Sequence, residues 1–138
     1  MTAAKISSAQ LKRIQKALAS VPFASLLQLE LENVGSGTAT LALNVRKELT
    51  QNHGIVHGGA IASLIDTATA FAILSVIAPK DRVTTVDLTI SYLRPVSKGR
   101  LRAVAKVVRA GRRLFVVSAE VLADEKVAAT ALSTYIKI

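Results

Sequence analysis

The stretch that decides the fold is residues 58–78, GGAIASLIDTATAFAILSVIA, in which Asp66 is the only charged residue. As one helix it would be about 30 Å long, because an α-helix rises 1.5 Å per residue. That length could cross a bilayer, but an aspartate at the centre of a membrane helix costs about 2.5–3.5 kcal/mol. The many small residues offer little to offset this cost. We therefore predict a buried helix of a globular protein, with bounds 57–78.

Alternating apolar and polar residues predict antiparallel strands on both sides of this helix. Before it, residues 29–32 and 39–45 alternate around a turn at Gly35 and Gly37, which indicates two strands. After it, four strand-like runs separated by short turn sequences read as a meander of hairpins: 83–93, 99–109, 113–123 and 127–137. In the first of these runs, alternation places Thr85 on the face opposite Leu88.

These elements predict an α+β layer architecture, in which the long helix is covered by the apolar face of a curved antiparallel sheet of five to six strands. Residues 8–19 form a short amphipathic helix with Ser7 or Ser8 as its cap, and this helix ends near Pro22. No linker or repeat indicates a second domain. We assign residues 1–138 to one domain, with an N-terminal helical segment 1–22, a central helix 57–78 and strands within 83–137.

Composition narrows the class of protein. The chain has no cysteine, which excludes disulfides, a thiolate zinc site and a cysteine nucleophile. The formal net charge is +9, and eight of the 18 basic residues lie between Arg94 and Arg113 with no acid among them, which favours an anionic partner. Aromatic residues make up only 4%, and no strand interleaves aromatic with basic residues, so we expect no nucleic-acid partner.

The N-terminus does not read as a secretory signal. It lacks an apolar core of about 7–15 residues followed by a small-residue cleavage site. Together with the absence of cysteine, this favours a cytoplasmic location. We expect no membrane partner.

The chemistry concentrates in residues 51–68, QNHGIVHGGAIASLIDTA. His57, Gly58 and Gly59 stand at the expected start of the helix, where the free N–H groups of the first turn favour negative charge. Two glycines there let a ligand approach the backbone closely. Such a helix start can polarise a carbonyl group or stabilise an oxyanion.

The spacing of His57 and Asp66 predicts an oligomer. Nine residues separate them, so they lie about 180° apart around the helix and about 13 Å apart along it. One substrate within one chain cannot easily contact both. A two-fold axis that places two such helices side by side would bring the two residues together from different subunits, in two equivalent sites. We therefore expect at least a dimer.

Two parts of the sequence resemble a known family. GIVHGG at residues 54–59, followed by LIDTA at 64–68, and TVDLTISYLRP at 85–95 are similar to the phenylacetate-pathway (PaaI-like) type of acyl-CoA thioesterase. The resemblance extends from Leu29 to the C-terminus. It implies a hotdog fold, hydrolysis of acyl-CoA or aryl-acyl-CoA thioesters without a metal or other cofactor, and a homotetramer.

The resemblance also implies a role for individual residues. Asp66 would act as general base on water or as nucleophile on the thioester carbonyl, and the Gly58 N–H would polarise that carbonyl. Thr85 would come from the opposite subunit and hold the attacking water. Gln51 falls where relatives carry Asn or Gln near the thioester. Gln51 and His57 are therefore also expected to be catalytic residues. The residues expected to contact CoA are Asn52, Gly59, Arg94, Arg112 and Arg113.

Each of these residues also has a purely structural explanation. Asp66 could make a structural hydrogen bond or a buried ion pair, His57 could cap the helix, and Thr85 could be an ordinary strand residue. The basic run could be a solvated surface. Two alternative functions stay open: a non-catalytic acyl-CoA sensor, and a hotdog hydratase or dehydratase, which would require a histidine paired with an acid in a pattern that this sequence lacks.

Overall fold

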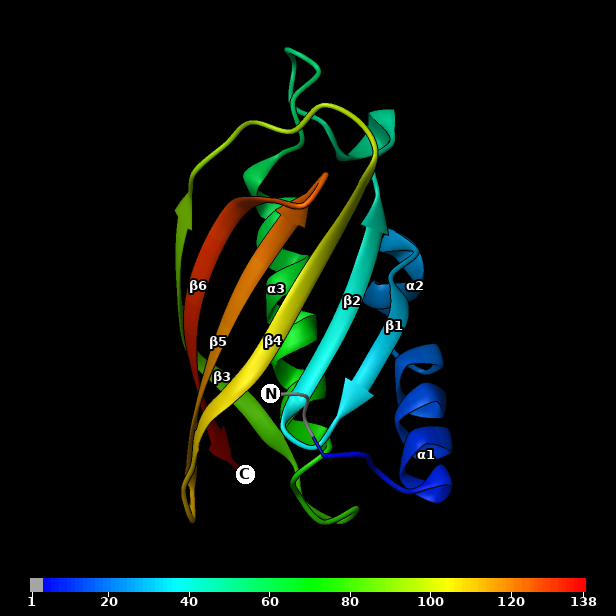
Figure 1. Ribbon diagram of the computed structural model, residues 1–138, viewed down its shortest axis with the longest axis vertical. Helices are drawn as coiled ribbons and strands as arrows, with labels where there is room; N and C mark the ends of the chain where they lie inside the picture. Colours follow the sequence, from blue (N-terminus) through cyan, green and yellow to red (C-terminus); the bar gives the residue numbers. More distant parts are fainter. Residues whose placement is uncertain (1–3) are drawn as a thin grey trace.

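The computed structural model describes residues 4–138, in which a six-stranded antiparallel sheet wraps around one long helix (Figure 1). Residues 1–3 of the predicted segment 1–22 lie outside this range. The elements in chain order are α1 (Ser8–Ala19), α2 (Pro22–Leu27), β1 (Glu30–Gly35), β2 (Thr38–Asn44), the 3-10 helix η1 (Lys47–Leu49), α3 (Gly58–Leu74), β3 (Val83–Tyr92), β4 (Arg100–Ala110), β5 (Leu114–Ala123) and β6 (Lys126–Lys137). The predicted α+β architecture is confirmed.

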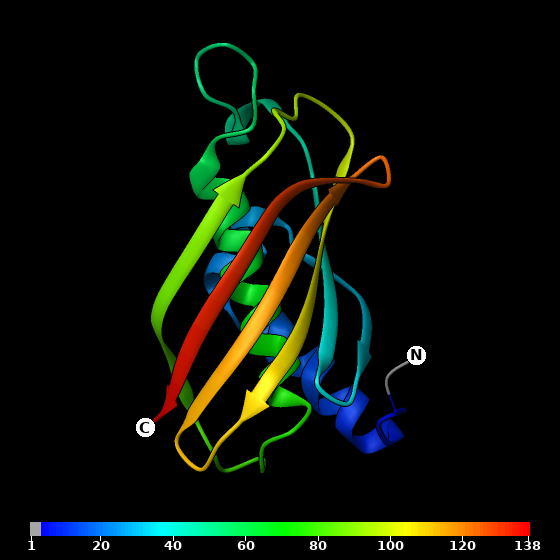
Figure 2. The same ribbon diagram turned by 60° about the vertical axis from the view of Figure 1, so that its left-hand side comes forward.

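One side of α3 is apolar and fills the concave face of the sheet, which curves around the helix in Figure 2. Leu64, Ile65 and Ala68 on this side are completely buried. Their spacing of three and four residues is that of an amphipathic helix with one face on a core. Burial on this scale contributes about 1.5–3 kcal/mol for each large aliphatic side chain, so it fixes the rotation of α3 about its axis.

The helix α3 is shorter at its C-terminal end than predicted. It ends at Leu74 rather than at Ala78, where the hydroxyl of the next residue, Ser75, bonds to the turn between β1 and β2 and to its own helix. The Ser75 hydroxyl accepts a hydrogen bond from the Gly37 N–H at 2.6 Å and donates one to the Ala72 carbonyl at 2.7 Å. No helix within residues 4–138 combines the length and apolar character needed to cross a bilayer.

The predicted meander is wrong for the first of its four strands, β3, which does not pair with the next strand, β4. The sheet runs β1-β2-β4-β5-β6-β3, so β3 pairs with β6 and β4 pairs with β2. Residues 93–99, between β3 and β4, are too many for a tight hairpin and are bonded elsewhere. Val56 donates its N–H to the Val96 carbonyl at 2.7 Å, and Val45 donates its N–H to the Gly99 carbonyl at 2.8 Å. The strand β3 therefore lies at an edge of the sheet.

The N-terminal helices flank this layer beside β1. Ser7 caps α1 as predicted, because its hydroxyl accepts a hydrogen bond from the Gln10 N–H at 3.1 Å. Arg13 ties α1 to the end of α3 by donating to the Leu74 carbonyl at 3.1 Å. The second helix, α2, was not predicted, because its six residues are too few to show a helical period.

The hydroxyl of Tyr135 joins β6 to the middle of α3. Tyr135 is only 2% exposed, and its hydroxyl donates to the Asp66 carbonyl at 2.6 Å and lies 2.8 Å from Thr69 Oγ1. Burial raises the pKa of Tyr135 to about 12; the hydrogen bond with Thr69 lowers the pKa, and the Asp66 carboxylate raises it further. The phenol is therefore a proton donor throughout the neutral range.

This buried phenol predicts a loss of stability at alkaline pH. The folded chain holds the Tyr135 proton more tightly than the unfolded chain, whose tyrosine pKa is about 10. The stabilisation is therefore complete below about pH 10 and is lost as the pH rises to about 12, by roughly 2–3 kcal/mol. Urea unfolding at one protein concentration should show this loss in the wild type and not in Tyr135→Phe. A difference between the two proteins that stays constant from pH 9 to 12 would contradict it.

Candidate active site

A β-bulge in β3 turns Thr85 toward α3. The pairing of β3 with β6 shifts by one residue between Thr85 and Asp87, so Val86 is the extra residue. Thr85 stands opposite the buried Tyr135 and thus on the helix-facing side of the sheet. The predicted placement of Thr85 on the face opposite Leu88 is wrong for this reason. Strict alternation holds only in a strand without a bulge.

Thr85 and Asp66 meet within one chain. The Thr85 hydroxyl donates to Asp66 Oδ1 at 2.8 Å. The resemblance implied that Thr85 would reach the site from the opposite subunit, whereas this hydrogen bond needs no second subunit. Thr85 is therefore a hydrogen-bond donor to the Asp66 carboxylate of its own chain.

Asp66 is held by hydroxyl groups and not by a cation. Tyr135 OH lies 3.1 Å from the same Oδ1 atom that Thr85 contacts, and the Asp66 side chain is half-buried. None of the ion pairs within residues 4–138 includes Asp66, and none of the hydrogen bonds there uses its Oδ2 atom. The ion-pair explanation of Asp66 is therefore wrong for the described chain, whereas the hydrogen-bond explanation describes part of its environment. Nor does the described chain gather three His, Asp or Glu residues that could hold a metal ion.

His57 caps the start of α3, where Gly58 begins the helix. Its Nδ1 atom accepts a hydrogen bond from the Gly59 N–H at 2.8 Å, so the capping explanation of His57 is confirmed. The predicted contact of Gly59 with CoA cannot use this N–H. The hydrogen bonds between described residues leave the Gly58 N–H without an acceptor, as expected for the first turn of a helix.

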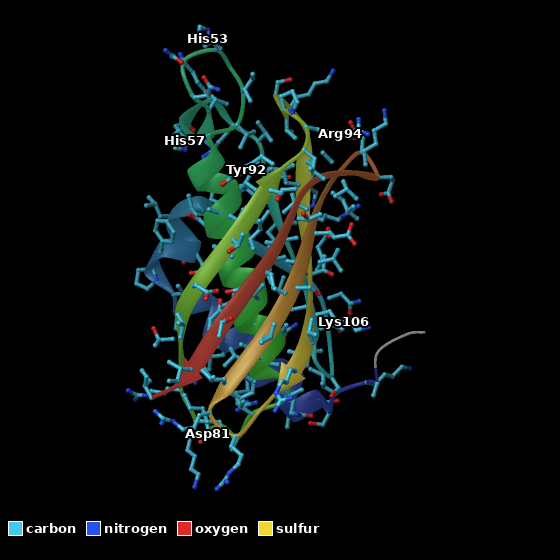
Figure 3. The ribbon with its side chains drawn as sticks, turned by 90° about the vertical axis from the view of Figure 1, so that its left-hand side faces the viewer. His53, His57, Asp81, Tyr92, Arg94 and Lys106 are labelled. Atoms are coloured by element: carbon cyan, nitrogen blue, oxygen red, sulfur yellow. The ribbon has the colours of Figure 1, made fainter. Side chains whose placement is uncertain are left out.

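Tyr92, at the end of β3, covers Gly58. Its hydroxyl donates to the Gly58 carbonyl at 2.8 Å, and a Cβ added to Gly58 would lie 3.2 Å from Tyr92 Cζ. Gly58, Ile61 and Tyr92 line a cleft of about 280 Å³ together with residues 93–96. Figure 3 shows His57 and Tyr92 at the same end of the molecule. Sequence reasoning missed Tyr92 because no local pattern connects it with a residue 34 positions away.

The predicted loop residues lie before the helix start, and no hydrogen bond between described residues joins them to the other candidates. Gln51 and Asn52 are exposed, in a turn closed by a hydrogen bond from the Gln51 N–H to the Ile55 carbonyl at 2.7 Å. His53 stands at the tip of this loop, away from the helix (Figure 3). The catalytic role of Gln51 and the CoA contact of Asn52 therefore stay predictions.

The basic run from Arg94 to Arg113 separates into groups with different surroundings. Arg100 and Arg102 are neutralised by ion pairs, and the hydrogen bond with Glu30 raises the pKa of Arg100. Their acidic partners are Glu30, Glu32 and Glu125.

The arginines predicted to contact CoA lie at opposite ends of the folded molecule. Arg94 lies at the end that carries Gly58 (Figure 3), whereas Arg112 and Arg113 occupy the β4–β5 turn at the other end. The length of β4 separates them, on the order of 30 Å for its 11 residues. One chain therefore does not bring the three arginines to a single ligand.

The arrangement offers a base and an oxyanion donor on one helix. The free Oδ2 atom of Asp66 can accept a proton, and the Gly58 N–H can donate to a developing negative charge. The two residues are about 12 Å apart along the axis of α3, which is too far for one carbonyl group and its attacking water to contact both.

The chain is similar to known thioesterases in sequence. The sequence model of the thioesterase superfamily matches residues 53–130, which include α3 and β3. The medium/long-chain acyl-CoA thioesterase YigI of Salmonella typhimurium is 30% identical in an alignment 131 residues long, and the alignment covers 83% of this chain and 84% of YigI.

Solved structures agree with this likeness. The PaaI protein from the phenylacetic acid degradation operon of E. coli superimposes with a TM-score of 0.87 at 25% identity, covering 97% of this chain and 96% of that chain. A mutant of the phenylacetic acid degradation protein PaaI from Thermus thermophilus gives a TM-score of 0.79 at 28% identity, covering 86% of this chain and 100% of the other. The helix and sheet described above therefore form the hotdog fold, and the chain belongs to the thioesterase superfamily.

Proposed function

We propose that this thioesterase hydrolyses acyl-CoA thioesters to the free acid and CoA, with Asp66 of one subunit and Gly58 of the partner subunit acting on the same thioester. The observation that carries this proposal is the environment of the Asp66 carboxylate, meaning its burial and its hydrogen-bond partners. Among residues 4–138 it is a half-buried carboxylate without a cationic partner, which accepts a hydrogen bond from Thr85 at Oδ1 and none at Oδ2. Burial without a counter-ion is costly for a carboxylate, which favours a catalytic over a purely structural reason for its position.

As general base, Asp66 takes a proton from water while the water oxygen bonds to the thioester carbonyl carbon. The carbonyl oxygen becomes an oxyanion, to which the Gly58 N–H donates from the start of α3. When the tetrahedral intermediate collapses, the C–S bond breaks and the CoA thiolate takes the proton from Asp66. The products are the carboxylic acid and the CoA thiol.

As nucleophile, Asp66 would instead bond to the carbonyl carbon through Oδ2 and expel the CoA thiolate. Water then hydrolyses the mixed anhydride and regenerates the carboxylate. Both routes need an ionised Asp66 and the same oxyanion donor. The hydrogen bond from Thr85 suits both routes, because it occupies Oδ1 and leaves Oδ2 available to the water or the thioester.

A dimer supplies the second half of each site. The flank of α3 next to Asp66 is only half-buried and consists of small residues, which would let a second helix approach closely. These residues are Ala62, Ser63, Thr67 and Ala70. The neighbouring edge strand β3 has one side without a strand partner, and Val86 on it is 54% exposed. A two-fold axis beside this surface would bring Gly58 of the partner subunit toward Asp66. A tetramer would be a pair of such dimers.

The names of the relatives indicate which acyl groups to test. The name of YigI points to medium and long chains, and that of the PaaI proteins points to phenylacetic acid degradation. A substrate panel therefore includes octanoyl-, palmitoyl- and phenylacetyl-CoA. A non-catalytic sensor would bind members of this panel without releasing thiol.

The first test removes the carboxylate. We expect Asp66→Asn and Asp66→Ala to release free thiol from the best substrate at least about 100-fold more slowly than the wild type, because general bases contribute about 10²–10⁴-fold. Circular dichroism checks that both variants fold. Unchanged turnover in both would show that Asp66 is not the catalyst, and binding without turnover in the wild type would indicate the sensor.

The second test removes the hydroxyl that orients Asp66. Thr85→Val keeps the shape of the side chain but loses the hydrogen bond to Oδ1. We expect kcat to fall about tenfold or more with little change in KM, since a hydrogen bond to a charged group is worth about 1.5–3 kcal/mol. Thr85→Ser, which keeps the hydroxyl, should restore most of the rate. Equal activity of Thr85→Val and Thr85→Ser would refute this role.

The third test asks whether sites are shared between subunits. Gly58→Pro removes the N–H donor at a helix position that tolerates proline, whereas Gly58→Ala keeps the N–H and meets Tyr92 in the same way. Gly58→Pro and Asp66→Ala should each be inactive alone. Random mixing of equal amounts of the two variants should restore about a quarter of wild-type activity. Half of the dimers are then mixed, and each mixed dimer contains one intact site out of two. Sites built within one chain would give no recovery.

A further inference from the structure

Three hydroxyl groups lie around Asp66, and the mechanism proposed for hydrolysis uses only that of Thr85. The other two belong to Tyr135 on β6 and Thr69 on α3, and their oxygen atoms are 2.8 Å apart. Tyr135 is 2% exposed and Thr69 is completely buried. Because both are shielded from water, each hydroxyl proton has to find its acceptor within the protein.

The Tyr135 hydroxyl has two acceptors on one residue, Asp66. Its oxygen is 2.6 Å from the Asp66 carbonyl oxygen and 3.1 Å from Asp66 Oδ1. A phenol carries one proton, so it can complete only one of these hydrogen bonds at full strength. The distances favour the carbonyl, whereas the charge of an ionised carboxylate favours Oδ1. The preferred acceptor therefore depends on whether Asp66 carries its charge.

Thr69 can replace Tyr135 at the Asp66 carbonyl. Its Oγ1 atom is 2.9 Å from the Ile65 carbonyl oxygen and 3.1 Å from the Asp66 carbonyl oxygen. When Tyr135 donates to the Asp66 carbonyl, Thr69 can donate to Ile65. When Tyr135 turns to Oδ1, Thr69 can donate to the Asp66 carbonyl instead. Both carbonyls also keep the ordinary hydrogen bond from the N–H four residues further along the helix, so neither arrangement leaves a buried acceptor unpaired.

Hydrolysis requires such an adjustment, because the charge of Asp66 changes twice in each turnover. As general base, Asp66 loses its negative charge when it takes a proton from water and regains it when the proton passes to the CoA thiolate. As nucleophile, it loses the charge in the mixed anhydride and regains it on hydrolysis. A hydrogen bond to the charged form is about twice as strong as one to the neutral form, so a donor fixed on one acceptor suits only one of these states.

We propose that Tyr135 and Thr69 are a pair of positioning residues whose hydroxyl groups turn together as the charge of Asp66 changes during hydrolysis. The inference rests on the proposed function, because it takes Asp66 as the catalytic carboxylate. With Asp66 ionised, Tyr135 donates to Oδ1 and Thr69 to the Asp66 carbonyl. With Asp66 neutral, Tyr135 donates to the carbonyl and Thr69 to Ile65. Both protons stay on their own oxygen atoms, in keeping with the pKa of about 12 that burial gives to Tyr135.

Thr69→Val tests the member of the pair whose hydrogen bonds do not reach the carboxylate. The substitution keeps the shape of the side chain and removes the hydroxyl. We expect kcat for the best acyl-CoA to fall about threefold to tenfold, with KM within about twofold of the wild type, because a neutral hydrogen bond contributes a factor of about 2–10. Thr69→Ser should restore most of the rate. An unchanged kcat in Thr69→Val, or a loss that Thr69→Ser does not restore, would overturn the assignment.

A double variant shows whether Thr69 acts through the phenol. Tyr135→Phe alone should lower kcat about tenfold or more, because it removes a donor to a charged group. Adding Thr69→Val to Tyr135→Phe should lower kcat by less than about twofold more, since Thr69 then has no phenol to replace. If the two losses multiply as independent effects do, the two residues do not act as a pair.

Ser75→Ala is the control for the loss of a buried hydroxyl. Ser75 follows the last residue of α3, is 5% exposed, and its hydroxyl makes two hydrogen bonds, neither of them with Asp66. We expect kcat of Ser75→Ala to stay within about twofold of the wild type. A loss as large as that of Thr69→Val would show that reduced stability lowers the rate, and would overturn the assignment. Circular dichroism and urea unfolding check that each variant is folded under the assay conditions.

Asp66→Asn, measured in the same thiol-release assay, separates this inference from the proposed function. If Asp66→Asn loses turnover while Thr69→Val and Tyr135→Phe keep the wild-type kcat, the inference fails and the proposed function stands. If Asp66→Asn releases thiol as fast as the wild type, the proposed function fails and the inference fails with it. Loss of turnover in Asp66→Asn, together with smaller and non-multiplicative losses in the Thr69 and Tyr135 variants, would support both.

Discussion

The contact between α3 and the concave face of the sheet determines where every candidate residue lies. Leu64 and Ile65 on the helix are completely buried, as are Leu41 on β2, Ala103 on β4 and Val117 on β5. Rotating α3 by one residue would expose these side chains, at a cost of several kcal/mol. The rotation is therefore fixed, and with it the direction of Asp66, which lies at the rim of this contact beside β3 and not in the centre of the core.

A carboxylate at such a rim needs hydrogen-bond donors, because partial burial removes part of its hydration. The fold supplies them from two strands of the sheet: Thr85 on β3, turned inward by the bulge at Val86, and Tyr135 on β6. Burial keeps the Tyr135 phenol protonated, since its pKa is about 12, so it remains a donor at neutral pH. Neither donor brings a positive charge to the carboxylate.

Local features of the sequence predicted the helix and the six strands, offered capping as one of two explanations for His57, and narrowed the cap of α1 to Ser7 or Ser8. Each of these features depends on residues a few positions apart. Features that depend on distant pairing were wrong or missed. The side of Thr85 depends on a bulge that strict alternation cannot reveal. Tyr135 bonds to a residue 69 positions away, and the neighbours of β3 and β4 depend on where residues 93–99 are bonded. Asp66 was found because it is the one charge in an apolar run, which needs no knowledge of its partners.

The positively charged side chains lie apart from the Asp66 carboxylate. A cation next to Asp66 would compete for the carboxylate with the proton of an attacking water, and so would weaken it as a base. At the helix start, the group that would stabilise the oxyanion is a neutral N–H. Arg100 and Arg102 on β4 form ion pairs with Glu30, Glu32 and Glu125. Arg94, Lys98 and Lys126, which make no ion pair with any described residue, instead line a cleft of about 350 Å³ beside the β5–β6 turn. Positive charge can then attract a phosphorylated substrate without neutralising the base that acts on it.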